Sequence, residues 1–295
     1  MNYKFFLIFF LVFCFLGWPI APAIAYEGEV VLTTEEHIKE LQEQIARLKA
    51  LIADIVLYKE ISAQSYLVVD VDSNTVISQK NITQSHSIAS ITKLMNALVA
   101  VENTSGNESI ILQEEMLKPQ GYSPSLFLKL TVTVKNLLKA SLIQSTNDAA
   151  QALTYVVGND KFIRLMNGRA RQLGMDDTYF YDAHGLDPSN RSTVVDITKL
   201  LTYLYNNHPD ILEITKENDF QLPDPTGKLL TFKNLNAFSR VAEFIGGKTG
   251  YLPQARQSFA GLFDLNGKTV AIVLLYSNNR QTDTQKLIDW VKNNE

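Results

Sequence analysis

Segments with the alternating pattern of β-strands lie at both ends of this chain and enclose a long middle of helical pattern. Near the N-terminal end, strands are predicted over 66–71 and 75–79, because Asp72-Ser73-Asn74 between them is typical of a hairpin turn. Asn266-Gly267 favours a second tight hairpin near the other end. The strands predicted on that side lie around 220–232, 241–249, 257–265 and 268–276.

Apolar residues at helical spacing predict a helix over 90–101, mainly helical structure over 134–205 and a closing helix over 282–292. Strands that enclose helices in this way predict one antiparallel sheet with an inserted helical lobe, and a cleft between the two. The expected fold class is therefore α/β of the α+β type, with the antiparallel sheet flanked by helices. We place this folded domain at 61–295.

The first 25 residues have the pattern of a signal peptide. Lys4 is their single charge, an apolar run from Phe5 to Leu16 follows, and Ala23-Ile24-Ala25 supplies a small-residue cleavage site. An uncleaved membrane anchor is the alternative, because no charge occurs from Phe5 to Ala25. Both interpretations predict an exported protein of the cell envelope, on the periplasmic or extracellular face of the membrane.

Residues 26–60 are predicted to form a spacer and then a coiled-coil-like helix that begins at Thr34. Apolar side chains separated by three and four residues form a heptad seam. We therefore predict a homo-oligomer through 34–57, with a helix packed on the globular domain as the alternative. Leu51, Val56 and Leu57 widen the apolar face, so this end of the helix is expected to dock. The seam consists of Ile38, Leu41, Ile45, Leu48, Ile52 and Ile55.

Charge and cysteine content exclude several classes of function. A formal net charge of −4, from 27 basic and 31 acidic residues, argues against a nucleic-acid partner. The lone Cys14 excludes an intrachain disulfide and a cysteine-based metal cluster. The four histidines are scattered without a His-Glu-x-x-His pattern, so no zinc site is expected.

Ser90-Ile91-Thr92-Lys93 is a candidate nucleophile with its base. Three residues make just under one helical turn, so the Lys93 amine can reach the Ser90 hydroxyl. A lysine acts as a general base only when it is neutral, and burial or a nearby cation lowers its pKa toward that state. Otherwise Lys93 is an ordinary solvated helix residue.

Two further triplets follow, Ser145-Thr146-Asn147 and Lys248-Thr249-Gly250. Each alone is unspecific: the first could be a loop before a helix, and the second could end a strand. Ala242 to Thr249 also fits a loose phosphate-loop pattern. We reject a nucleotide site, because such a loop must lead into a helix and a strand pattern follows here.

The three triplets in this order resemble the penicillin-binding and serine β-lactamase superfamily, and most closely its D-alanyl-D-alanine carboxypeptidases of low molecular mass. The resemblance covers roughly 62–295 and implies a β-lactamase/transpeptidase-like fold. Segments around the triplets and between them also look like that family. They are Ala89–Met95, Ser145–Ala150, His184-Gly185-Leu186-Asp187, Ser192-Thr193 with Asp196, Asn234-Leu235-Asn236 and Gly247–Tyr251.

The resemblance implies that Ser90 attacks the carbonyl of the penultimate D-Ala of a peptidoglycan stem peptide and forms an acyl-enzyme. Lys93 would take the Ser90 proton, and Ser145 would relay a proton to the departing D-Ala. Asn147 would hold the substrate amide or position Lys93. β-Lactams would acylate the same serine as inhibitors. This acyl transfer needs only side chains and backbone groups, so no metal and no organic cofactor is implied.

Substrate binding is assigned by the same resemblance. Lys248 would supply positive charge that helps to keep Lys93 neutral, and Thr249 would bind the terminal carboxylate. The strand through Gly250 and Tyr251 would pair with the substrate, and the N–H groups of Ser90 and Tyr251 would form the oxyanion hole. Arg280 is expected near the carboxylate pocket, although a surface arginine explains it equally well.

Other reactions remain open on this fold. A D,D-endopeptidase or transpeptidase would use the same residues. A class A β-lactamase would carry a glutamate after the Ser-x-Asn motif, and 175–190 contains none. A catalytically silent coiled-coil scaffold is the alternative from another class. Ala255-Arg256 stands where relatives usually have Ala-Gly, which predicts a narrower or charged cleft rim.

Two other expectations concern residues outside the triplets. His184 suggests a serine–histidine–aspartate triad, but the Gly-x-Ser-x-Gly elbow is missing, so we expect it to shape a loop at the cleft. Many relatives add a C-terminal β domain with a membrane helix, which the sequence after Gly250 is too short to include. The N-terminal segment is therefore the expected site of any tether.

Overall fold

The computed structural model describes residues 33–119 and 126–294. The chain divides into two compact units, Met1–Leu51 and Ile52–Glu295. The predicted signal peptide or anchor at 1–25 lies outside the described residues, as does nearly all of the predicted spacer. Among the helices in the described part, none is long and apolar enough to cross a membrane.

The predicted N-terminal helix is confirmed as α2, Thr34–Glu60. Thr33 and Glu36 cap its start reciprocally: the Glu36 N–H donates to Thr33 Oγ1, and the Thr33 N–H donates to the Glu36 carboxylate. Its six heptad residues are 37–60% exposed. The expected docking is correct for Leu57, which is 5% exposed. It is wrong for Val56, which is 47% exposed. Leu51 belongs to the first unit, and its docking stays a prediction.

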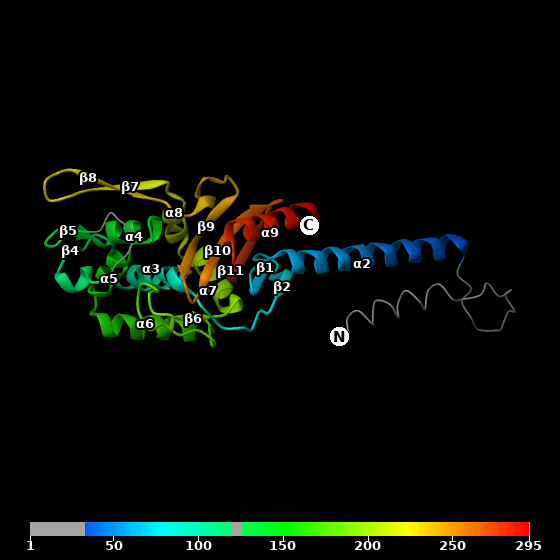
Figure 1. Cartoon of the computed structure of the whole chain (residues 1–295), viewed down its shortest axis with the longest axis horizontal. Helices are drawn as coiled ribbons and strands as arrows, with labels where there is room; N and C mark the ends of the chain where they lie inside the picture. The colour runs from blue at the N-terminus through cyan, green and yellow to red at the C-terminus, as the bar shows by residue number, and fades with distance from the viewer. Residues whose placement is uncertain (1–32, 120–125, 295) are drawn as a thin grey trace. The chain divides into compact units, whose positions relative to one another are not determined.

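The second unit is built on the predicted antiparallel sheet (Figure 1). Its strand order is β2-β1-β11-β10-β9, so strands from the two ends of the unit are neighbours. β1 pairs with β11 from Ser65 opposite Leu275 to Asp70 opposite Val270. The strands are β1 (Ser65–Asp70), β2 (Thr75–Lys80), β9 (Phe244–Leu252), β10 (Arg256–Leu265) and β11 (Lys268–Ser277).

Asn266 and Gly267 form the hairpin between β10 and β11, both with positive φ, at 54° and 77°. This confirms the turn expected there. The prediction around 220–232 is wrong in one respect, because this segment does not join the main sheet. It forms a separate hairpin, β7 (Asp219–Pro223) with β8 (Leu229–Lys233). Asp224 and Gly227 close its turn, so the two short strands pair with each other.

Helices make up the predicted lobe on one side of this sheet (Figure 1). At its centre, α3 (Thr92–Asn103) is buried from Thr92 to Ala100, so neighbours surround almost its whole circumference. The other helices of the lobe are α4 (Val134–Ile143), α5 (Asn147–Thr154), α6 (Asn159–Gln172), α7 (Val194–Asn207) and α8 (Pro209–Lys216). Short pieces are η1 (Ala89–Ile91), η2 (Glu114–Leu117), η3 (Ala237–Arg240), and the pairs β3 (His86–Ser87) with β6 (Arg191–Ser192) and β4 (Ser109–Ile111) with β5 (Thr131–Thr133).

Both faces of the sheet are covered, which explains why β11 is apolar along its length. Ala271 and Val273 belong to the core shared with the helical lobe. Ile272 and Leu274 point to the opposite face, into a second core that includes α9 (Arg280–Asn294). Successive side chains of a strand point to opposite faces, so one strand serves two cores.

A buried carboxylate joins the N-terminal and C-terminal ends of the second unit. Asp283 of α9 is 2% exposed, and it accepts hydrogen bonds from the Ser62 N–H at 3.0 Å and the Ala63 N–H at 2.9 Å. The hydroxyls of Ser62 and Ser277 donate to it at 2.7 and 2.6 Å. Four donors therefore depend on one side chain.

Replacing Asp283 by alanine is predicted to destabilise the protein, because these buried donors lose their acceptor. We expect a loss of about 3 kcal/mol in the free energy of unfolding, measured by urea denaturation. Asp289→Ala on the exposed side of the same helix is the matched control, with an expected change within about 0.5 kcal/mol. Equal effects of the two substitutions would contradict this account of the network.

Candidate active site

Ser90 lies where η1 passes into α3, and Lys93 follows on the first turn of α3. The preceding Ala89 has a positive φ of 48°, which turns the chain sharply before the helix. Lys93 Nζ lies 3.0 Å from Ser90 Oγ. The sequence spacing thus brings the amine and the hydroxyl into hydrogen-bond contact.

Lys93 is fully buried, and its amine is surrounded by oxygen acceptors. It donates to Asn147 Oδ1 at 2.8 Å and to the backbone carbonyl of His184 at 2.6 Å. Burial lowers the pKa of Lys93 to about 7, against the opposing charges of Asp182 and Asp148. A large share of the amine is therefore neutral near neutral pH.

The neutral amine has a defined orientation. It carries two N–H bonds and one lone pair, and carbonyl oxygens can only accept hydrogen bonds. Asn147 Oδ1 and the His184 carbonyl therefore take both N–H groups. The lone pair is left facing Ser90 Oγ, where it can accept the hydroxyl proton. This arrangement is what a general base for Ser90 requires.

Ser145 and Lys248 form a second contact pair in the same site. Ser145 has a positive φ of 63° in the link before α5, and Lys248 Nζ donates to its hydroxyl at 2.9 Å. Lys248 is 3% exposed and also donates to the Thr249 carbonyl at 3.2 Å. Burial lowers the pKa of Lys248 well below its usual value, and Lys93 and Arg280 lower it further.

Lys248 is expected to help keep Lys93 neutral, and the structure adds a larger cause. The main cause of the low pKa of Lys93 is its own burial, and the charges acting on it from Asp182 and Asp148 raise that pKa. Two buried amines in one site disfavour each other's charge, but desolvation dominates for both.

β9 carries Lys248-Thr249-Gly250 through its middle and is the edge strand of the sheet. Its Gly250 packs so closely on η1 that a Cβ there would meet the Ile88 carbonyl oxygen at 2.7 Å and Ser90 N at 3.3 Å. A glycine is therefore required to bring the strand beside the nucleophile. The strand continues to Leu252 without a helix, which agrees with the rejection of a nucleotide loop.

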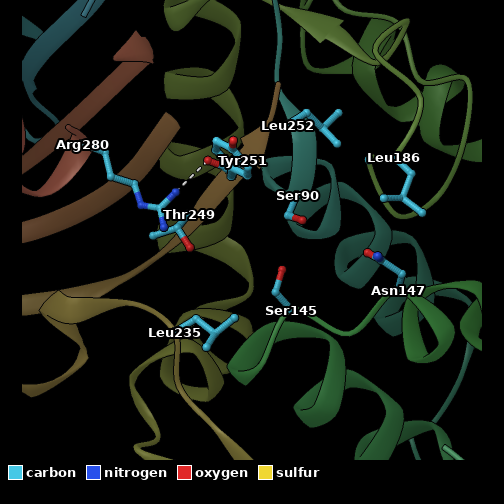
Figure 2. Close-up of a pocket in the computed structure, with 11 residues that line it drawn as sticks. Ser90, Ser145, Asn147, Leu186, Leu235, Thr249, Tyr251, Leu252 and Arg280 are labelled. Atoms are coloured by element: carbon cyan, nitrogen blue, oxygen red, sulfur yellow. Dashed lines mark hydrogen bonds between the residues drawn. The ribbon is translucent and has the colours of Figure 1, made fainter. Parts of the chain in front are cut away.

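A pocket of about 310 Å³ opens where these elements meet (Figure 2). The hydroxyls of Ser90 and Ser145 face this hollow from η1 and from the link before α5. Arg280 lies at its far side and donates to the Gly250 carbonyl at 2.9 Å. Its lining residues are Ser90, Ser145, Asn147, Gly185, Leu186, Leu235, Thr249, Gly250, Tyr251, Leu252 and Arg280.

Seven of the nine residues singled out from the sequence line this pocket, and Lys93 and Lys248 lie buried in contact with Ser90 and Ser145. Leu186, Leu235 and Leu252 add an apolar lining that no sequence motif indicated. Arg256 is not among the pocket's lining residues, contrary to expectation. Its guanidinium lies 5.1 Å from the centre of the Tyr276 ring and bonds to Asn278.

His184 shapes a loop at the site, as expected, and its backbone matters more than its ring. Burial lowers the pKa of the imidazole to about 4, so the ring is neutral at physiological pH. Its backbone carbonyl supplies the acceptor for Lys93, a role that no side-chain pattern indicates. Across 33–119 and 126–294, no cluster of three or more His, Cys, Asp or Glu could hold a metal ion.

Comparison with known proteins agrees with this geometry. A D-alanyl-D-alanine carboxypeptidase of Mycobacterium tuberculosis is 29% identical over 72% of this chain and 75% of its own length. A D-alanyl-D-alanine endopeptidase of Haemophilus influenzae is 32% identical over 74% of this chain and 76% of its own. Penicillin-binding protein D2 of Listeria monocytogenes, solved with cefotaxime bound, superposes with a TM-score of 0.66 at 28% identity, covering 78% and 97% of the two chains.

The sequence profile described as D-alanyl-D-alanine carboxypeptidase matches residues 52–279, which include the three triplets and every lining residue of the pocket except Arg280. The fold is that of the penicillin-binding proteins and DD-transpeptidases, as expected from the sequence. This chain belongs to the D-alanyl-D-alanine carboxypeptidase family, whose members are hydrolases.

Proposed function

We propose that this protein removes the terminal D-Ala from peptidoglycan stem peptides through an acyl-enzyme on Ser90. The observation that carries the proposal is the buried amine of Lys93, held by two carbonyl acceptors with its lone pair toward the serine hydroxyl. Family membership supports the choice of a D-alanyl-D-alanine substrate.

In acylation, the Ser90 proton passes to the neutral Lys93 amine as Oγ bonds to the carbonyl carbon of the penultimate D-Ala. The oxyanion is stabilised by the backbone N–H groups of Ser90 and Tyr251. When the intermediate collapses, the C–N bond breaks and the departing amine needs a proton. The Ser145 hydroxyl, which accepts from Lys248 at 2.9 Å and faces the same hollow, gives its proton to the departing amine. The proton that Lys93 took from Ser90 replaces it, so that Lys93 is neutral again. Water then hydrolyses the ester: its oxygen bonds to the acyl carbon, the bond from that carbon to Ser90 Oγ breaks, and Oγ regains a proton from the water.

Charge and strand geometry support the binding of a peptide C-terminus. Thr249 and Arg280 line one side of the pocket and suit a terminal carboxylate. The edge strand β9 can pair with an extended peptide, which would place the scissile carbonyl near Ser90. β-Lactams are proposed to acylate Ser90 as inhibitors, and the cefotaxime complex of a structural neighbour supports this.

A D,D-endopeptidase is the second candidate, favoured by the 32% identity to the Haemophilus influenzae enzyme. It would use the same residues on a cross-linked substrate in which the departing amine belongs to a second stem. Parallel assays with a stem pentapeptide and with a cross-linked dimer separate the two. Faster cleavage of the dimer would favour the endopeptidase.

Ser90→Ala is predicted to abolish D-Ala release from a stem pentapeptide, since no other hydroxyl is paired with Lys93 among the described contacts. Activity should fall at least about 10³-fold, the scale seen when a nucleophile is removed. Intact-mass measurement should show a penicillin adduct on the wild type and none on the variant. Persistent release by Ser90→Ala would contradict the assignment, and rapid turnover of penicillin would favour a β-lactamase.

The activity of the wild type is predicted to depend on pH through Lys93. Its pKa of about 7 means that the amine is protonated, and unable to accept a proton, at lower pH. We expect kcat/KM to fall about tenfold per pH unit below that value and to level off above it. A Lys93→Arg variant, charged at every accessible pH, should lack this limb and lose at least about 10²-fold in activity. An acid limb in the wild type near pH 4 would contradict a lysine base.

We also propose that the protein acts outside the cytoplasm, because its family is named for a cell-wall peptide and the segment 1–25 has a signal-like pattern. Membrane anchoring by that segment and self-association through 34–57 belong to the same proposal. The exposed Ile45 and Leu48 in the middle of α2 support self-association.

Sedimentation of the 26–295 chain tests the self-association. We expect an oligomer that becomes monomeric when Ile45 and Leu48 are both replaced by glutamate, because charges at heptad core positions are incompatible with a packed seam. Lys39→Glu and Glu43→Lys, on the polar side of the helix, form the control pair. A monomeric wild type at concentrations up to about 100 μM would contradict the proposal.

A further inference from the structure

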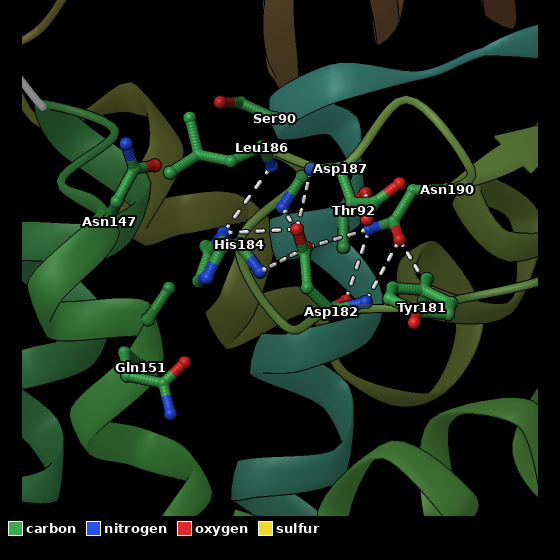
Figure 3. A network of polar contacts seen from close by, with 12 residues as sticks. Ser90, Thr92, Asn147, Gln151, Tyr181, Asp182, His184, Leu186, Asp187 and Asn190 are labelled. Atoms are coloured by element: carbon green, nitrogen blue, oxygen red, sulfur yellow. Dashed lines mark hydrogen bonds and ion pairs between the residues drawn. The ribbon is translucent and has the colours of Figure 1, made fainter. Parts of the chain in front are cut away.

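The loop 181–190 carries the backbone carbonyl that contacts Lys93, and a single carboxylate organises that loop (Figure 3). Asp182 Oδ1 accepts the N–H groups of His184 at 3.0 Å and Gly185 at 2.5 Å. Asp182 Oδ2 accepts the Asp187 N–H at 2.6 Å. Three backbone groups of the loop are thus bound to one side chain.

Asn190 connects the same loop to the helix that carries the candidate base. Its Nδ2 donates to Asp182 Oδ1 at 3.0 Å and to Thr92 Oγ1 at 3.0 Å. Thr92 is the residue before Lys93 on α3. Asn190 Oδ1 accepts the N–H groups of Tyr181 and Asp182 at 2.7 and 3.0 Å. The position of the loop is therefore fixed relative to Lys93 by side chains that do not touch the substrate pocket.

Close packing leaves the loop little freedom to move. A Cβ on Gly185 would meet the Ala89 carbonyl oxygen at 2.0 Å, so the loop backbone lies directly against the residue before Ser90. Gly185 also has a positive φ of 86°. A small displacement of this backbone would move the His184 carbonyl and release the Lys93 N–H that it accepts.

Resting on the proposed function, we infer that Asp182 is a positioning residue for the reaction: it holds the His184 carbonyl against Lys93 and places a negative charge beside that amine. Asp182 acts on Lys93 through the loop backbone and through its negative charge, and it does not contact the substrate.

Charged groups on several elements act on Lys93, and they decide the sign of the pH effect. Asp182 in the loop and Asp148 on α5 both raise the pKa of Lys93. Burial raises the pKa of Asp148 itself. Lys248 on β9 and the imidazole of His184 also interact with Lys93, and burial disfavours the charged form of each. Removing the charge of Asp182 is therefore expected to lower the pKa of Lys93.

Asp182→Asn and Asp182→Ala test the inference, with Asp176→Asn as a control that removes one exposed negative charge. Asp182→Asn keeps one carbonyl oxygen for the His184 and Gly185 N–H groups. It should retain activity reduced about tenfold, with the acid limb of its kcat/KM profile moved to lower pH. Asp182→Ala should lose about 100-fold, the scale of misplacing a catalytic group by about 1 Å. Asp176→Asn should match the wild type.

A purely structural role for Asp182 would lower kcat/KM without moving the acid limb, and that result would overturn the inference. Wild-type activity in Asp182→Asn with an unmoved limb would overturn it too. Thermal unfolding of each variant excludes loss of folding as the cause, and if Asp182→Ala does not fold, Asp182→Asn carries the test. Absence of D-Ala release and of a penicillin adduct in the wild type would instead contradict the proposed function.

Discussion

The amine of Lys93 is buried completely, and the rest of the site is arranged around the consequences. Burial lowers its pKa to about 7, which supplies a neutral base where an exposed lysine would stay charged. Two carbonyl acceptors then fix the direction of its lone pair toward Ser90. Desolvation makes the Lys93 amine a proton acceptor, and the two hydrogen bonds orient its lone pair.

The architecture explains how a lysine can be buried so deeply. α3 passes through the centre of the helical lobe. At its N-terminal end, η1 and α3 contact the edge strand β9. Segments that are distant in sequence complete the surroundings: Asn147 from α5, the His184 carbonyl from a loop, and Lys248 from β9. The pairing of β1 with β11 joins the two ends of the unit in one sheet, and this sheet holds these segments together.

The parts of this site that a sequence can predict are those set by local geometry or by family-like side chains. The contact between Ser90 and Lys93 follows from helical spacing, and the turn at Asn266-Gly267 follows from conformational preference. The separate hairpin at 219–233 was not predictable, because an alternating pattern does not determine which strands pair with each other. The role of the His184 carbonyl was not predictable either. Every residue has a backbone carbonyl, and only the tertiary structure determines which of them accepts a hydrogen bond from Lys93.

Direct titration of the Lys93 amine tests the central claim most directly. In protein labelled with ¹³C at the lysine ε carbons, the Lys93 resonance can be assigned by its absence from a Lys93→Met variant and followed against pH. The account predicts a midpoint near 7, far below the ordinary value of 10.5. A Lys93 resonance that titrates near the ordinary lysine value would show a charged amine at neutral pH and would contradict its role as the base.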